Sequence, residues 1–237
     1  MEVLKSEFDS EVLGISVAKL SGTPRSEEDV RAIIDVASGK GFRVVFWSAF
    51  YEETIELESY IRAMGNFCST KVKYRIHLND SLVSAVSLSA RSANVREYDS
   101  LEASPELIEL SKQAGGDIRF YHDPNLSYKQ FENLYTAWIQ SSTQKEAANV
   151  VLTSFENSRM TGLVTVKVDS VANSASIVLL SVHPDHRHQG VGKSLIAAAL
   201  RWTHQNGFSI CEVVTQSSNK GAKGIAVLHH LPIFRQF

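Results

Sequence analysis

The sequence predicts an α+β protein, with a mixed, mainly antiparallel sheet flanked by helices and a small α/β domain in front of it. Two patterns along the 237 residues support this. Residues 1–95 alternate between short strand-like and helix-like segments, as in a small α/β unit. From residue 149 onward, apolar residues recur at every second position in three consecutive segments, as in antiparallel strands. The predicted domains are 1–95 and 103–237, with their junction in the Ser-, Ala- and Asn-rich segment 79–102.

Composition indicates a globular chain with a core of its own. Hydrophobic residues make up 43% and charged residues 21%, which excludes a disordered chain. The net charge of −2 gives no strongly basic face, so we expect no nucleic-acid partner. The two cysteines form no C-x-x-C pair and indicate a reducing compartment. Without a signal-like N-terminus or a membrane-length apolar run, a cytoplasmic protein with no membrane partner is expected.

The first domain is predicted from one clear helix and the strands around it. Gly14–Leu20 alternates like a strand. Ser26 begins a helix, because Asp29 follows three positions later, close to a capping box, and apolar residues then recur at helical spacing until Gly39. The other elements predicted here are strands at 42–48 and 71–77 and a helix at 52–64.

The second domain is predicted to begin with two helices. Pro105 starts the first, which Gly115 and Gly116 end. Residues 128–140 carry an aromatic stripe that is more typical of a core than of a substrate contact. The elements expected after them are strands at 149–155, 162–168, 176–182 and 210–215 and a helix at 193–204.

The segment Arg187–Lys193, between the last antiparallel strand and its helix, predicts a phosphate site. Gly190 and Gly192 let the backbone approach a ligand closely, and the amides of Gln189 to Lys193 lie at a helix N-terminus, which attracts anions. A P-loop is disfavoured, because the glycine it needs five positions before Gly192 is Arg187 here. The alternative that the two glycines only permit a tight turn stays open.

This segment resembles the main signature of the Gcn5-related N-acetyltransferase (GNAT) family, Arg/Gln-x-x-Gly-x-Gly/Ala after an antiparallel strand. Here it reads Arg187-x-x-Gly190-x-Gly192, preceded by Val182-His183-Pro184, and residues 213–219 resemble a second signature. The resemblance covers residues 103–222 and implies acetyl-CoA as the acetyl donor, with its diphosphate on the loop and its pantetheine along a splayed strand. The residues implied for acetyl-CoA are Leu180, Val182, Arg187, His188, Gln189, Gly190, Val191, Gly192, Lys193 and Asn219.

Two further segments resemble the dTDP-fucosamine acetyltransferases, GNAT enzymes with an extra N-terminal domain. They are residues 8–14 and 119–124. This resemblance implies a small-molecule amine acceptor, a dTDP-linked 4-amino-6-deoxy sugar, bordered by Arg119, Tyr121 and His122. An ordinary solvated loop is the alternative for those three residues. Another amine or a protein N-terminus is the alternative acceptor.

Acetylation of an amine requires a base for the amine, a donor to the thioester oxygen and an acid for the thiolate. The resemblance assigns the donor to a backbone N–H of the splayed strand, that of Val182. It places a tyrosine acid seven residues after Asn219, where this chain has Ala226, a departure that bears on activity. Ser176 stands on the strand where many relatives carry a carboxylate base. His183, acting through water, is the candidate base, because imidazole titrates near neutral pH.

His183, His186 and His188 crowd one loop, but a zinc site would need a fourth ligand and a scaffold that brings them together. We therefore expect no metal, and solvated histidines instead.

After about residue 222 the sequence departs from the family, which continues with a Leu-Tyr pair and two last strands. One hypothesis is an altered reading frame near Lys223, which would leave a truncated copy without the final strand. The other is a genuine variant with a different acid, such as water. The runner-up function is accordingly a catalytically impaired acyl-CoA-binding relative. A homodimer is left open.

Overall fold

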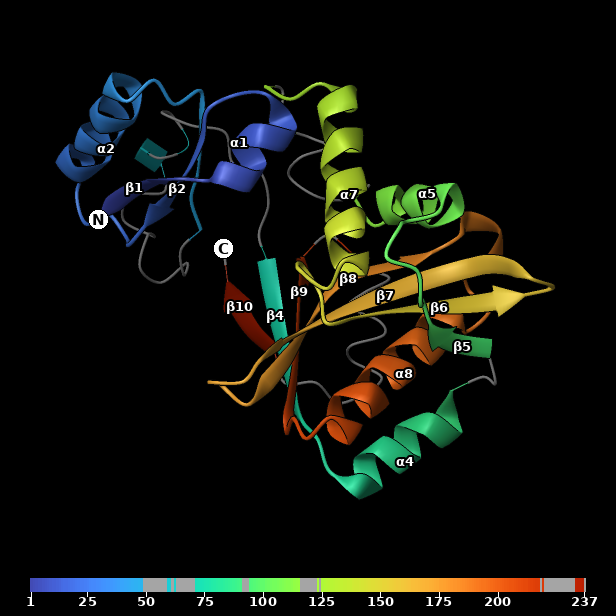
Figure 1. Ribbon diagram of the computed structural model, residues 1–237. Coiled ribbons are helices and arrows are strands. Elements are labelled where there is room, and N and C mark those ends of the chain that lie inside the picture. Colours follow the sequence, from blue (N-terminus) through green and yellow to red (C-terminus); the bar gives the residue numbers. More distant parts are fainter. Residues whose placement is uncertain are drawn as a thin grey trace. The chain divides into compact units, whose positions relative to one another are not determined.

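The computed structural model describes residues 1–48, 59–60, 62, 71–90, 94–115, 123, 125–217, 219 and 233–236 (Figure 1). The chain divides into two compact units. The first comprises Met1–Val72, Ile118–Leu134 and Arg235–Phe237, and the second comprises Lys73–Asp117 and Tyr135–Phe234. Among the described helices, none combines the length and the apolar character that crossing a membrane requires.

The first unit contains a three-stranded sheet in the order β1-β2-β3. Strand β1 runs antiparallel to β2, and β3 runs parallel to β2. Val3, Ala18 and Ala37 form its buried core, with Ile33 and Phe42 packed against them. The elements are β1 (Glu2–Lys5), α1 (Glu7–Leu13), β2 (Val17–Ser21), α2 (Glu27–Gly39) and β3 (Val44–Phe46).

Polar contacts within the segment 8–14 connect α1 to β2. Asp9 is buried and accepts hydrogen bonds from Ser6 Oγ at 2.6 Å and Lys19 Nζ at 2.8 Å. Ser10 Oγ accepts the Val17 N–H at 3.0 Å. The segment that carries part of the closer resemblance therefore has a structural role in this unit.

The second unit is built on a seven-stranded sheet in the order β10-β4-β9-β8-β7-β6-β5. Strands β5 to β8 pair antiparallel, whereas β8 and β9 pair parallel. The predicted fold class is thus confirmed: the chain has a mixed, mainly antiparallel sheet with helices, and in addition a small N-terminal α/β sheet. The strands are β4 (Lys71–His77), β5 (Asn94–Glu97), β6 (Val150–Glu156), β7 (Arg159–Asp169), β8 (Ser174–Val182), β9 (Ile210–Gln216) and β10 (Ile233–Gln236).

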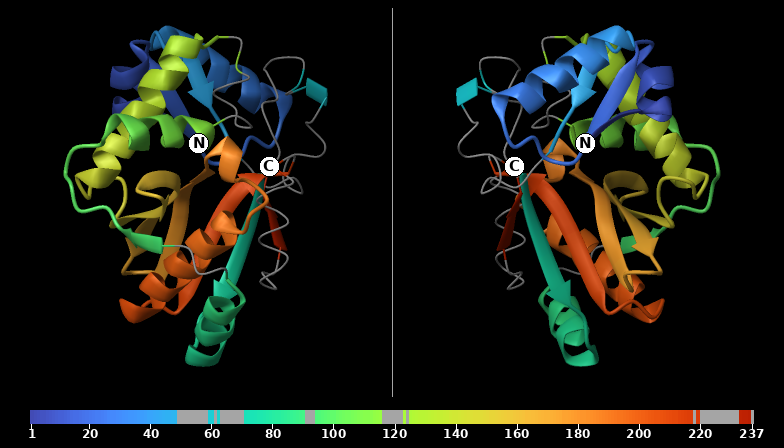
Figure 2. Two further views of the ribbon diagram at one scale, coloured as in Figure 1. Left: turned by 90° about the vertical axis from the view of Figure 1, so that its right-hand side faces the viewer. Right: turned by 90° about the vertical axis from the view of Figure 1, so that its left-hand side faces the viewer.

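The helices of the second unit lie on both faces of its sheet. Figure 1 shows α8 and α5 on opposite sides of β6, β7 and β8, and Figure 2 shows α8 along the sheet from two further sides. Leu195 and Ala199 of α8 are fully buried against Val164 and Val166. The helices are α4 (Asp80–Ser89), α5 (Pro105–Gln113), α8 (Val191–Gln205), the short 3-10 helix η3 (Pro184–His186) and α7 (Tyr128–Thr143), whose residues are shared between the two units.

The segment predicted as the junction, 79–102, contains α4 and β5. Asn79 caps α4, because its side chain accepts the Leu82 N–H at 2.9 Å, and Val86 is buried in the core beside α8. Helix α4 carries apolar residues on its exposed face as well as its buried one, such as Leu88 and Val86, so the helical period is weak in the sequence. Strand β4 also belongs to the large sheet. The domain ranges 1–95 and 103–237 stay a prediction.

A short strand, β10, lies near the C-terminus, after the point where the sequence departs from the family, and the predicted truncation or divergence there stays a prediction. The residues of β10, Ile233–Gln236, lie next to β4 at one edge of the large sheet. The short Ile-Phe run after Pro232 is too brief to predict a strand from its period alone.

Glu212 on β9 joins β9 to β4 through two cations. Its carboxylate contacts Lys73 Nζ at 2.6 Å and the Arg75 guanidinium at 2.5 Å. Burial alone would raise the pKa of Glu212, but the hydrogen bonds and charges of Lys73 and Arg75 outweigh it and hold the pKa below its ordinary value of 4.5. The ionised carboxylate therefore stabilises the sheet.

Glu212→Gln should lower the free energy of unfolding by about 1.5–3 kcal/mol at pH 7, because it removes charged hydrogen bonds. A depressed folded-state pKa gives stability that is fully present above about pH 4.5 and is lost as the pH falls through the folded-state value. The difference in free energy of unfolding between wild type and Glu212→Gln should therefore become smaller below pH 4.5. Urea unfolding at several pH values measures it, and a difference that stays constant down to pH 3 would contradict the assignment.

Candidate functional site

Strands β8 and β9 of the large sheet pair over only the first part of their length. Strand β8 pairs with β7 as far as Val182, but its parallel ladder to β9 joins only Ser174–Ile177 to Ile210–Val213. Both strands continue beyond that ladder, to Val182 and Gln216. Within the described residues, the last part of β8 therefore presents one backbone edge that β9 does not cover.

The hydrogen bonds between β8 and β7 show to which edge each main-chain amide of β8 points. The Leu179 N–H donates to Thr165 Oγ1 at 3.0 Å, and the His183 N–H donates to the Thr161 carbonyl at 2.9 Å. Because successive residues of a strand point their amides to opposite edges, the N–H groups of Leu180 and Val182 lie on the uncovered edge.

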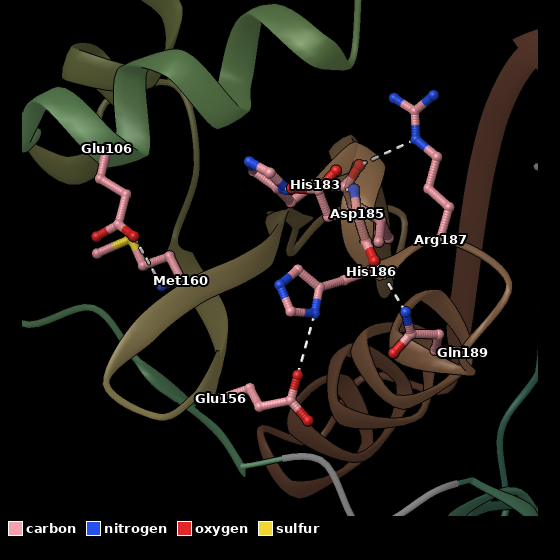
Figure 3. A network of polar contacts seen from close by, with 9 residues as sticks. Glu106, Glu156, Met160, His183, Asp185, His186, Arg187 and Gln189 are labelled. Carbon is pink, nitrogen blue, oxygen red and sulfur yellow. Dashed lines mark hydrogen bonds and ion pairs between the residues drawn. The ribbon is translucent and has the colours of Figure 1, made fainter.

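The loop after β8 turns back over this edge. The Arg187 Nε donates to the Val182 carbonyl at 3.2 Å, and the Gln189 side chain donates to the Asp185 carbonyl at 2.8 Å (Figure 3). His188 and Gly190 have left-handed φ angles of 60° and 87°. Gly190 tolerates this conformation without the strain that a side chain would bring. The positive φ fits the alternative that Gly190 permits a tight turn from strand to helix, and close approach of a ligand stays a prediction.

Helix α8 begins directly after the loop, with Gly190 as its N-cap residue. Its Ser194 N–H donates to the Gly190 carbonyl at 3.1 Å. For the preceding amides of Val191, Gly192 and Lys193, the described part of the chain provides no acceptor. The first turn of α8 also contains no acidic residue. These donors and the positive end of the helix dipole are suited to an anion.

Two of the three predicted histidines, His183 and His186, make separate polar contacts near this loop. His183 Nδ1 accepts the Asp185 N–H at 3.3 Å, and His186 Nδ1 lies 3.1 Å from Glu156 Oε2 (Figure 3). While that bond to Asp185 holds, a neutral His183 ring carries its proton on Nε2, which leaves no ring nitrogen to accept another. This opposes the base role of His183, which stays a prediction. Within the described residues, no three His, Cys, Asp or Glu side chains form a group that could hold a metal ion.

Two residues that the sequence did not single out lie at the same place. Gly162 on β7 pairs with Val182, and a Cβ added to it would lie 2.6 Å from the Ser181 carbonyl oxygen and 2.9 Å from Leu195 Cδ1. Ser181 is 4% exposed, and none of the described residues pairs with its Oγ. The only signal in the sequence is one polar residue inside the apolar run at 177–182.

The structure brings most of the predicted coenzyme residues together at the end of β8 and the start of α8. They are Leu180, Val182, Arg187, His188, Gln189, Gly190, Val191, Gly192 and Lys193. Asn219 lies after β9, where its N–H donates to the Gln216 carbonyl at 3.0 Å. Arg119, Tyr121, His122 and Ala226 lie outside the described residues. The roles of all of them in binding stay predictions.

Comparison with known proteins supports the resemblance to the GNAT family. Residues 117–227 match the family model described as the acetyltransferase (GNAT) family. A functionally unknown conserved protein from Staphylococcus epidermidis is similar with a TM-score of 0.66 at 15% identity, over 100% of this chain and 89% of that one. A GCN5-related N-acetyltransferase from Sphaerobacter thermophilus gives 0.63 at 12% identity, over 99% and 73%. The comparison with curated proteins finds no match. The chain therefore has the GNAT fold, and its residues 117–227 match the model of the GNAT acetyltransferase family.

Proposed function

We propose that this protein is an acetyl-CoA-dependent N-acetyltransferase that transfers the acetyl group to the amine of a small acceptor. The observation that carries the proposal is the junction of β8 and α8, where the uncovered amides of a strand edge meet those of a helix N-terminus. Acetyl-CoA is an extended molecule with a thioester at one end and a diphosphate further along. It can therefore use both the strand-edge amides and the amides of the helix N-terminus.

The diphosphate is assigned to the first turn of α8. The amides of Val191, Gly192 and Lys193 are available to its oxygens, and the Lys193 side chain adds positive charge. Among the described residues, the Arg187 guanidinium bonds the Val182 carbonyl through Nε, so its two terminal nitrogens keep their donors for a phosphate. Without an acid in the first turn of α8, no fixed carboxylate there opposes the anion.

The pantetheine and the thioester are assigned to the uncovered edge of β8. The amides of Leu180 and Val182 lie on this edge with one residue between them, a spacing that suits an extended chain running alongside the strand. One of them, assigned to Val182, donates to the thioester oxygen. As the amine nitrogen attacks the carbonyl carbon, a C–N bond forms, and the oxygen gains the charge that this donor stabilises.

The second step breaks the C–S bond, and the thiolate leaves with the bonding electrons. The proton that the nitrogen loses ends on this sulfur, so the products are an N-acetylated acceptor and the free thiol of coenzyme A. The family position of the acid is Ala226, which leaves a water molecule as the carrier of this proton. A slow release of thiol is the expected consequence.

The proposed acceptor is the amine of a dTDP-linked 4-amino-6-deoxy sugar. Support comes from the resemblance of residues 8–14 and 119–124 to dTDP-fucosamine acetyltransferases. A cationic residue such as Arg119 suits the diphosphate of a nucleotide sugar. Another amine or a protein N-terminus is the alternative within the same reaction class.

A second candidate function is that of an acyl-CoA-binding protein without turnover, which Ala226 at the family position of the acid favours. Calorimetric titration with acetyl-CoA, followed by an assay for free thiol with a panel of amines, separates the two. The panel contains the dTDP-linked amino sugar, a peptide with a free N-terminus and a simple alkylamine. Binding followed by thiol release supports the enzyme, and binding alone supports the second candidate. Absence of binding contradicts both.

A further inference from the structure

The hydroxyl of Ser181 is a buried polar group that the described fold leaves without a partner. Three buried side-chain oxygens in the described part of the chain share this property, those of Tyr74, Ser181 and Thr203. A buried hydroxyl without a hydrogen bond is unfavourable, and such a group in a folded protein needs an explanation. Only Ser181 belongs to the part of β8 beyond its ladder with β9.

Ser181 stands between the two residues whose amides lie on the uncovered edge. Its own position is fixed, because it pairs with Leu163 of β7 and its carbonyl closely approaches Gly162. The side chains of Leu180 and Val182 pack against the core around α8. Side chains alternate along a strand, so that of Ser181 projects to the opposite face, away from α8.

Helix α5 covers part of this face over β7 and β8, but the face is partly exposed toward β9, where an acceptor would approach a thioester on the edge of β8. The face toward α8 is filled by the core that includes Leu195 and Val191. On the opposite face, Val178 of β8 and Val214 of β9 are about half exposed, at 50% and 47%. A group that orients the acetyl carbonyl for attack is therefore best placed where the Ser181 side chain is.

We propose that the Ser181 hydroxyl donates a hydrogen bond to the thioester oxygen of acetyl-CoA, as a second donor beside the Val182 amide. The inference rests on the proposed function. A hydroxyl and the amide of the next residue can converge on one acceptor. The buried hydroxyls of Ser154 and Thr161 pair with each other at 2.8 Å and do not bond Ser181. When the amine attacks, the electrons of the carbonyl double bond move onto the thioester oxygen, and both donor bonds strengthen.

The test compares Ser181→Ala with the wild type in titrations with acetyl-CoA and with coenzyme A. The variant should lose roughly two- to tenfold in affinity for acetyl-CoA, the range for one hydrogen bond, with no change for coenzyme A. The carbonyl stretch of bound acetyl-CoA labelled with carbon-13 at the carbonyl should move toward its value in an apolar solvent. Ser174→Ala is the control, since Ser174 is also buried on β8 but lies in the part paired with β9.

Thermal unfolding without ligand provides the second measurement. Loss of a hydroxyl without a partner should leave the midpoint of Ser181→Ala unchanged or raise it. A clearly lowered midpoint would show that the fold itself uses the hydroxyl and would overturn the inference. The inference would also be overturned if Ser181→Ala had the same ratio of acetyl-CoA to coenzyme A affinity as wild type and the same carbonyl frequency. That result would leave the proposed function intact. If wild type fails to bind acetyl-CoA, the proposed function fails instead.

Discussion

Gly190→Glu should weaken the binding of acetyl-CoA by at least about a hundredfold. The substitution places a carboxylate at the N-cap of α8, beside the amides assigned to the diphosphate. Two like charges 4 Å apart repel by about 4 kcal/mol near a protein surface, and about 2.7 kcal/mol already corresponds to a hundredfold loss. The φ angle of 87° at Gly190 adds strain for any side chain, which further displaces the loop. Calorimetric titration measures the dissociation constant.

Gly207→Glu is the matched control. Gly207 also has a left-handed φ angle, 85°, and a Cβ there meets no atom within 4 Å, so the same residue brings similar backbone strain and the same charge. It lies beyond the other end of α8, which finishes at Gln205. The affinity of Gly207→Glu for acetyl-CoA should equal that of wild type. Equal affinities for Gly190→Glu and wild type would refute the assignment of the diphosphate to this helix terminus.

The strength of local signals explains which parts of the second unit could be predicted. Strand β4 lies at the predicted 71–77, and α5 at Pro105–Gln113 begins at the proline that was expected to start it. The loop at 187–193 could be located because two glycines between an apolar strand pattern and a helical pattern mark the junction of the two elements. In each case the information lies within a few consecutive residues, which is the range that periodicity and capping rules cover.

The position of β4 beside β9 could not be predicted, because it depends on residues far apart in the sequence. The Leu78 N–H donates to the Ser209 carbonyl at 2.8 Å, and Arg75 pairs with Glu212, 137 positions later. The alternation of hydropathy in β4 indicates a strand but carries no information about its neighbour. The local order of strands and helices therefore favoured a small unit within residues 1–95.

The faces on which the side chains of β8 lie could not be predicted from the sequence, because the pairing of β7 and β8 contains a β-bulge. Strict alternation would place Ile177, Leu179 and Ser181 on one face of the sheet. The register with β7 shifts at Thr165/Val166, so that Ile177 and Leu180 both pack toward α8. A bulge inserts one residue into a strand and thereby exchanges the faces of the residues after it. Ser181 consequently projects away from α8, a fact on which its proposed role depends and which only the pairing register reveals.

Gly162→Ala should lower the free energy of unfolding by about 1–3 kcal/mol, the usual effect of an extra carbon in a filled core. A Cβ at Gly162 would lie 2.6 Å from the Ser181 carbonyl oxygen and 2.9 Å from Leu195 Cδ1. The first contact is to backbone in a paired strand, so it cannot be relieved by a side-chain rotation. Either β7 and β8 separate or the pair moves off α8, and both changes displace the strand assigned to the thioester. Urea unfolding measures the loss of stability.

Gly39→Ala separates this steric effect from the general effect of adding a methyl group. Gly39 is the last residue of α2, and a Cβ there meets no atom within 4 Å. Replacing it should leave stability unchanged or raise it by up to about 1 kcal/mol, because alanine restricts the unfolded chain more than glycine does. Acetyl-CoA affinity should fall in Gly162→Ala alone, since only that change moves Ser181 and Val182. If Gly162→Ala were as stable as wild type and kept full affinity, β8 could shift freely against β7, and a donor array fixed by that pairing would no longer explain how the coenzyme binds.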